Sequence, residues 1–185
     1  MNKQNLHFWL TLGRPLSRLS GIVFVTLLFS GCASVSVQSA RDSAFSEPIH
    51  KLFVLLNHVQ VDTIDASFTP YLITALKDGF SKKGVEIEIR VISPLALNEN
   101  ASVSEIASYK PDGIMTIVVN GGVVAATGGM ATILYNVSIF DSLKNKRIWR
   151  AQIDASGGTA VREKRMQMMV QKLSQRLSDD KIISQ

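Results

Sequence analysis

The chain has 185 residues, 46% of them apolar, and a formal net charge of +5. Three basic residues, Lys3, Arg14 and Arg18, precede an apolar run at 22–29, so loss of residues 1–31 would leave 154 residues with a net charge of +2. That length suits one domain with its own core. A charge so close to neutral argues against nucleic acid as a partner.

The apolar run leads to Cys32, the one cysteine of the sequence. It is too short to span a bilayer comfortably, and its basic flank is typical of a cleavable signal. Phe29, Ser30, Gly31 and Cys32 resemble the lipobox of bacterial lipoproteins, although leucine is usual where Phe29 stands. The resemblance implies that residues 1–31 are a signal peptide and that Cys32 carries the lipid, palmitate included, that anchors the protein in the bilayer. An uncleaved anchor and an ordinary secretory signal are the alternatives.

The residues after Cys32 bear on location and on the link to the domain. No Asp stands at the second place after the cysteine, which by resemblance to enterobacterial sorting implies the outer membrane, with the domain at its periplasmic face. Residues 33–48 are rich in Ser and Ala without a sustained apolar period, which predicts a tether. We therefore expect 32–48 to be the lipidated N-terminus and flexible tether, and 49–185 to be a single domain. Because lipid consumes the thiol, that domain can form no disulfide.

Apolar periodicity predicts five strands and three helices in the domain. Alternating or unbroken apolar runs predict strands at 52–56, 85–91, 114–119, 132–140 and 147–155. Apolar residues at helical spacing predict helices at 70–83, 102–109 and 159–178. Pro70 suits a first helical position, and Gly84 suits the turn that ends a helix.

This order of elements predicts an α/β (α+β) fold, β-α-β-α-β-β-β-α. The run 52–56 is apolar throughout and 114–119 is apolar except for Thr116, which is typical of central strands buried on both faces. Right-handed crossovers then predict a five-stranded mixed sheet with the order 2-1-3-4-5 and the helices packed on it. Strands 85–91 and 147–155 would be its edges, and Trp149 would face the core.

The helix at 159–178 has an apolar stripe and a basic face. Met166 and Met169 are expected in the core and Met168 outside it. The basic residues are expected on a solvated face, and attraction to anionic polymer or lipid head groups is the alternative; they are Arg162, Lys164, Arg165, Lys172 and Arg176.

A hairpin motif at 139–151, Ile-Phe-Asp-Ser-Leu-Lys-Asn-Lys-Arg-Ile-Trp-Arg-Ala, resembles the small α/β lipoproteins related to the TolB N-terminal domain. That group includes the lipoprotein activators of penicillin-binding proteins and the curli-secretion lipoprotein. The rest of the resemblance is the lipobox and the order of elements. Because one fold hosts many functions, the resemblance implies an outer-membrane lipoprotein and no particular activity.

Residues suited to catalysis or metal binding are sparse. His50 and His58 flank the first strand without a Cys or a spaced His to join them, so no metal is expected. Asp62 and Asp65 lack a nucleophile in a strained turn, and acids before a helix commonly stabilise its first turn. The Gly-rich segment 120–131 lacks the Gly-Lys-Ser/Thr ending of a phosphate loop. The sequence therefore predicts no enzyme, no catalytic residue and no cofactor.

An apolar stretch within the Gly-rich segment is the candidate contact site. It consists of Val123, Val124, Ala125 and Ala126, and an exposed apolar loop persists more readily when a partner or a membrane covers it. The sequence favours a membrane-anchored envelope lipoprotein that acts as a non-enzymatic interaction or assembly module, bound to an envelope protein or to copies of itself. The alternative is a periplasmic small-ligand binder or enzyme that uses the strand-end loops.

Overall fold

The computed structural model describes residues 33–57, 68–92, 99–124, 130–158 and 162–184. The chain divides into two compact units, Met1–Gly31 and Cys32–Gln185, and all described residues belong to the second. The predicted signal peptide and Cys32 itself lie outside the described residues.

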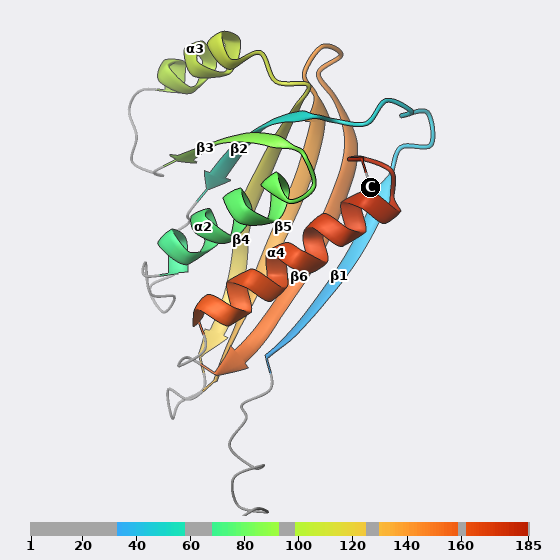
Figure 1. The fold of residues 1–185 in the computed structure, drawn as a ribbon. Helices are drawn as coiled ribbons and strands as arrows, with labels where there is room; N and C mark the ends of the chain where they lie inside the picture. Colours follow the sequence, from blue (N-terminus) through green and yellow to red (C-terminus); the bar gives the residue numbers. More distant parts are fainter. Residues whose placement is uncertain (1–32, 58–67, 93–98, 125–129, 159–161, 185) are drawn as a thin grey trace, which may run out of the picture. The chain divides into compact units, whose positions relative to one another are not determined.

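One six-stranded sheet forms the centre of the second unit (Figure 1). Its strands run in the order β1-β6-β5-β4-β2-β3. Their bounds are β1 Ser34–Arg41, β2 Lys51–Asn57, β3 Glu86–Ile92, β4 Gly113–Val124, β5 Met130–Asp141 and β6 Lys146–Gly158. The five expected strands keep their predicted neighbours, but the expected count was wrong because a sixth strand, β1, extends the sheet beyond β6.

Strand β1 overturns the predicted tether. All eight of its residues pair antiparallel with β6, from Ser34 opposite Ser156 to Arg41 opposite Trp149. Val35 is buried and Val37 partly buried, and both pack against the core. The two valines alternate with polar residues, so the segment has one apolar face, and pairing with β6 lets it bury that face. The 147–155 strand is therefore internal and not an edge.

Two parallel crossovers set the centre of the sheet. β2 pairs parallel with both β3 and β4, and every other pairing is antiparallel. Helix α2 (Phe68–Ser81) joins β2 to β3, and helix α3 (Glu99–Tyr109) joins β3 to β4. Gly84, after α2, has φ of 68°, as expected of the residue that ends a helix. Strand β3 is an edge, as predicted.

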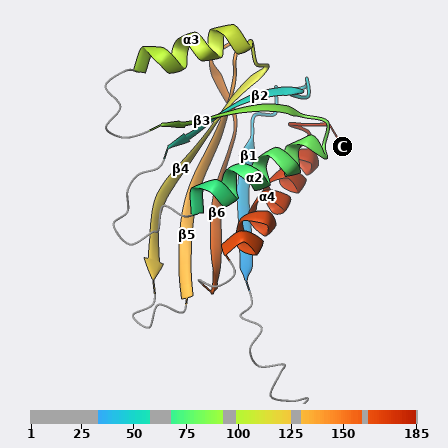
Figure 2. The same ribbon diagram turned by 60° about the vertical axis from the view of Figure 1, so that its left-hand side comes forward.

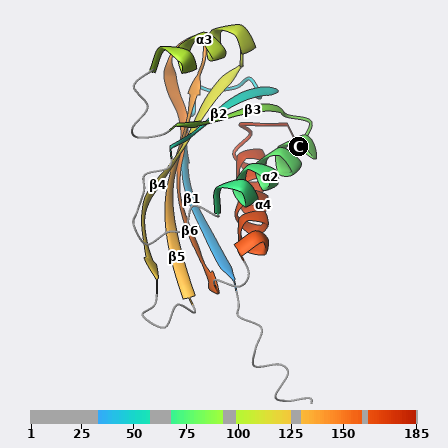
Figure 3. The same ribbon diagram turned by 90° about the vertical axis from the view of Figure 1, so that its left-hand side faces the viewer.

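Helices α2 and α4 (Arg162–Asp179) lie side by side over one face of the sheet (Figure 3). Their buried residues, such as Leu76 of α2 and Leu173 of α4, pack against the strand residues that point toward the helices, such as Ile117 of β4 and Ile153 of β6. Met166 and Met169 are fully buried, as predicted. Met168 is partly buried against the core and not exposed.

Helix α3 lies on the opposite side of the sheet from α2 and α4 (Figures 2 and 3). Phe53 of β2 points away from the α2–α4 core, and its ring meets Tyr109 edge-on with centroids 5.7 Å apart. Lys51 lies over the same Tyr109 ring, and Arg90 of β3 pairs with Glu105. Burial, together with the charge of Glu86, raises the pKa of Tyr109 to about 12. These contacts place α3 over β2 and β3.

A polar cluster joins β1, β6 and the end of α4. Asp180 accepts hydrogen bonds from the Trp149 indole (2.8 Å) and the Ser39 hydroxyl (2.6 Å), and it pairs with Arg176 at 3.3 Å. Trp149 is 1% exposed, which confirms the predicted inward position. Burial raises the pKa of Asp180, but the hydrogen bonds from Ser39 and Trp149 and the charge of Arg176 outweigh it, so this pKa lies below its ordinary value of 3.8.

Candidate interaction surfaces

The predicted contact stretch is only partly a loop. Val123 and Val124 are the last two residues of β4, and Ala125 and Ala126 lie outside the described residues. Val123 is opposite Thr132 of β5, and its side chain is 71% exposed. The loop expectation was wrong for the two valines because β-branched residues suit a strand, and β4 continues past a register shift at Val119/Gly121.

Of the residues considered for metal binding or catalysis, the structure describes His50 alone. His50 is exposed, while His58, Asp62 and Asp65 lie outside the described residues. The carboxylate of Asp112 accepts hydrogen bonds from the backbone N–H groups of His50 and Lys51, so it stabilises the start of β2. Within the described ranges no three His, Cys, Asp or Glu side chains are grouped to hold a metal ion. Nor is any helix there long and apolar enough to cross a bilayer.

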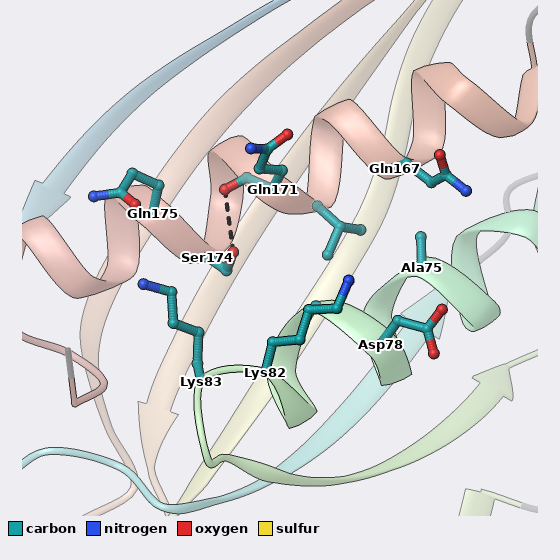
Figure 4. A pocket seen from close by; sticks show the side chains of 10 residues that line it. Ala75, Asp78, Lys82, Lys83, Gln167, Gln171, Ser174 and Gln175 are labelled. Carbon is teal, nitrogen blue, oxygen red and sulfur yellow. Dashed lines mark hydrogen bonds between the residues drawn. The ribbon is translucent and has the colours of Figure 1, made fainter.

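A groove of about 510 Å³ runs between α2 and α4 on the outer side of the helices (Figure 4). Three glutamines one helical turn apart, Gln167, Gln171 and Gln175, form one wall. Lys82 and Lys83, in the turn after α2, extend from the other side toward α4. The groove therefore offers amide groups, two ammonium groups and the carboxylate of Asp78 to a polar ligand.

Gly79 explains why the two helices approach closely at the floor of this groove. A Cβ atom added at Gly79 would lie 2.5 Å from Cγ1 of Val170, closer than real Cβ contacts come. Ala75 and Ser174, also small, continue the floor. The groove was not predicted from the sequence. The one feature of the sequence that points to it is the spacing of four residues between the glutamines of α4.

The face of β1, β6, β5 and β4 that points away from α2 and α4 has no described helix over it (Figure 3). Its exposed residues include the polar Gln38, Asn136 and Gln152 and, at the end of β4, the apolar Val123. Half-buried apolar side chains lie between them, among them Leu134 and Phe140. We call this surface the open face of the sheet.

The two edges of the sheet differ in charge. β3 carries Glu86, Glu88 and Arg90, and such charges discourage pairing with another strand. β1 has the sequence Ser-Val-Ser-Val-Gln-Ser-Ala-Arg, with Arg41 at its end as the one charged residue. A neutral edge strand of this length is the kind on which other chains can add a strand.

Arg165 was expected on a solvated face of α4 but is fully buried. It donates to the carbonyl oxygens of Ala131 (2.7 Å) and Gly157 (3.0 Å), and its guanidinium lies 4.7 Å from the centre of the Phe68 ring. Burial lowers the pKa of Arg165, yet guanidinium stays charged in proteins. The residue ties the start of α4 to the ends of β5 and β6.

No family model matches the chain, and no curated protein matches it. Among solved structures it is similar to the PelC dodecamer from Paraburkholderia phytofirmans, with 13% identity, a TM-score of 0.54, and coverage of 82% of this chain and 100% of that one. It is also similar to lipoprotein GNA1162 from Neisseria meningitidis, with 15% identity, a TM-score of 0.44, and coverage of 70% and 98%. The PelC likeness shows a shared fold, and the narrower resemblance to the TolB group stays a prediction.

Proposed function

We propose that the protein is a lipid-anchored envelope lipoprotein that acts as a non-enzymatic assembly module at the periplasmic face of the outer membrane. Cys32 carries the anchor, and the folded unit associates with copies of itself or with an envelope protein. The place of β1 is the observation that carries the proposal, because a neutral edge strand begins two residues after the candidate lipid site.

Three further features support assembly. The open face of the sheet has no described helix over it, and it joins the β1 edge through Ser36 and Gln38, which point to that side. Two of the described acids, Asp112 and Asp180, are engaged in structural hydrogen bonds. The solved PelC structure of the same fold is a dodecamer, so this fold is compatible with a closed ring of copies.

The anchor and the assembly are tested separately. Cys32→Ser should abolish palmitate labelling and membrane recovery, and normal labelling of this variant would refute the anchor. Outer-membrane placement predicts that the wild-type protein follows outer-membrane markers on a density gradient; recovery with inner-membrane markers would refute it.

Assembly is tested by native mass spectrometry and sedimentation of the detergent-solubilised protein. We expect a defined oligomer, or one stoichiometric envelope partner. Ser36→Lys with Gln38→Lys places two cations on the neutral edge and should dissociate the complex. Ser108→Lys, exposed on α3 and away from the β1 edge and the α2–α4 groove, is the control and should leave it intact. A wild-type protein that is monomeric and without a partner would refute the assembly role.

The α2–α4 groove favours a second function, the binding of a small anionic ligand. Lys82 and Lys83 are its two basic lining residues and Asp78 its acidic one, so one positive charge is left over for an anion. If this function holds, native mass spectrometry of protein isolated from the envelope will show an added small-molecule mass, and Lys82→Glu with Lys83→Glu will remove it. A wild-type protein without added mass would argue against this function and leave the assembly proposal standing.

A further inference from the structure

Four strands bring one row of residues to the end of the domain at which the anchor is attached. Ser34 pairs with Ser156, Ser156 with Thr132, and Thr132 with Val123. Neighbouring strands lie roughly 4.8 Å apart, so Val123 is about 14 Å from Ser34 across the sheet. Cys32 precedes Ser34 by two residues, a distance of at most about 7 Å along extended chain. Val123 therefore presents an exposed apolar side chain beside the anchor.

The first turn of α4 adds positive charge to the same end. The hydrogen bonds of Arg165 to Ala131 and Gly157 place this turn beside the row, since Ala131 and Gly157 each lie next to a member of it. Arg162 and Lys164 are the basic residues of this turn that are not buried, and Glu163 is its acidic residue. Arg165 is buried and bonded to the backbone, so it does not face lipid. The dipole at a helix N-terminus also favours anions, so this turn is suited to face anionic lipid head groups.

The opposite end of the sheet lacks this link to the anchor. Leu143, in the β5–β6 turn, is 95% exposed. Asp141, at the end of β5 beside Leu143, is nine positions along the strand from Thr132, the residue opposite Val123. Leu143 is therefore roughly 30 Å farther along the sheet than Val123. The two exposed apolar side chains mark opposite ends of the same domain.

We infer that the end of the domain marked by Val123 rests on the phospholipid bilayer. Val123 inserts at the level of the head groups, and the first turn of α4 faces anionic lipid. The inference rests on the proposed anchor at Cys32. A strand that begins two residues after the lipid leaves little freedom to rotate, so the anchor and the sheet together impose one orientation on the domain.

The experiment uses the processed, lipidated protein, in which acylation removes the native thiol. Val123→Cys is labelled with an environment-sensitive fluorophore, and the protein is reconstituted into vesicles of phosphatidylethanolamine and phosphatidylglycerol. Leu143→Cys, labelled in the same way, is the matched control. We expect the label at position 123 to shift its emission to shorter wavelength and to be quenched by lipids with a nitroxide near the head group. The label at position 143 should show neither effect.

The outcomes separate the inference from the proposed function. A protein that fails to float with the vesicles refutes the anchor, and the orientation with it. A protein that floats while both labels report water refutes the orientation alone, as does stronger quenching at 143 than at 123. Omission of phosphatidylglycerol should weaken quenching at 123, and unchanged quenching would refute the contact of the α4 turn with anionic lipid.

Discussion

Asp180→Ala tests whether the cluster of Trp149, Ser39 and Arg176 holds β1 and β6 to the end of α4. The carboxylate accepts two side-chain hydrogen bonds, and bonds to a charged group contribute about 1.5 to 3 kcal/mol each. Ser39 keeps a partner in Arg176 at 2.6 Å, so part of its contribution is retained. The buried indole N–H of Trp149 loses its acceptor. We therefore expect a loss of about 2 to 4 kcal/mol from a total of roughly 5 to 15 kcal/mol.

Urea unfolding of the signal-free chain measures this loss, because Trp149 is then its one tryptophan. Asp179→Ala is the matched control, since Asp179 is exposed on the adjacent position and should cost no more than about 0.5 kcal/mol. A double-mutant cycle with Trp149→Phe, followed by circular dichroism, isolates the pair. Equal losses in Asp180→Ala and Asp179→Ala, or a coupling energy near zero, would refute the reasoning.

The same cluster gives a pH dependence with a definite sign. Because the pKa of Asp180 is lowered in the folded state, its contribution is complete above the ordinary value of 3.8 and is lost as pH falls from there through the folded-state pKa. Asp180→Ala should therefore lose less stability than the wild type over that acid range. A parallel loss in both proteins would contradict the assignment.

Three other substitutions test the packing. Gly79→Ala forces a Cβ against Val170 and should cost about 1 to 3 kcal/mol in spite of the better helix propensity of alanine, and Val170→Ala in the same chain should recover part of the loss in thermal unfolding. Val35→Asp should lower the free energy of unfolding in urea by several kcal/mol, whereas Gln38→Asp on the other side of β1 should not. If neither substitution lowered it, residues 34–41 would be a flexible tether and not a strand of the core. Val123→Ser should leave the free energy of unfolding within about 0.5 kcal/mol, and a larger loss would make Val123 a core residue.

The strands with strong periodic patterns could be predicted from the sequence. Residues 52–56 were expected to be buried on both faces, and in the structure α2 and α4 cover one side of β2 while α3 covers part of the other. The same expectation for 114–119 was wrong on one face, because Ile114, Thr116 and Val118 of β4 are only half-buried on the open face. The alternation at 85–91 gave a charged edge strand, and β3 is that edge. The local pattern was sufficient to predict these strands, because the order of apolar and polar residues indicates a strand with at least one face against the core.

β1 could not be predicted in the same way, although Val35 and Val37 alternate with polar residues. Two valines among serines are too weak a signal alone, and their value as a strand depends on pairing with β6, more than a hundred residues later. The same holds for the groove at Gly79 and for the buried position of Arg165, since each depends on how distant elements meet. The sequence by itself determined the candidate anchor, the core strands and the order of their neighbours. Only the tertiary structure decided that the sheet begins at the anchor, because strand pairing over long sequence separation depends on the partner strand and leaves little trace in the local pattern.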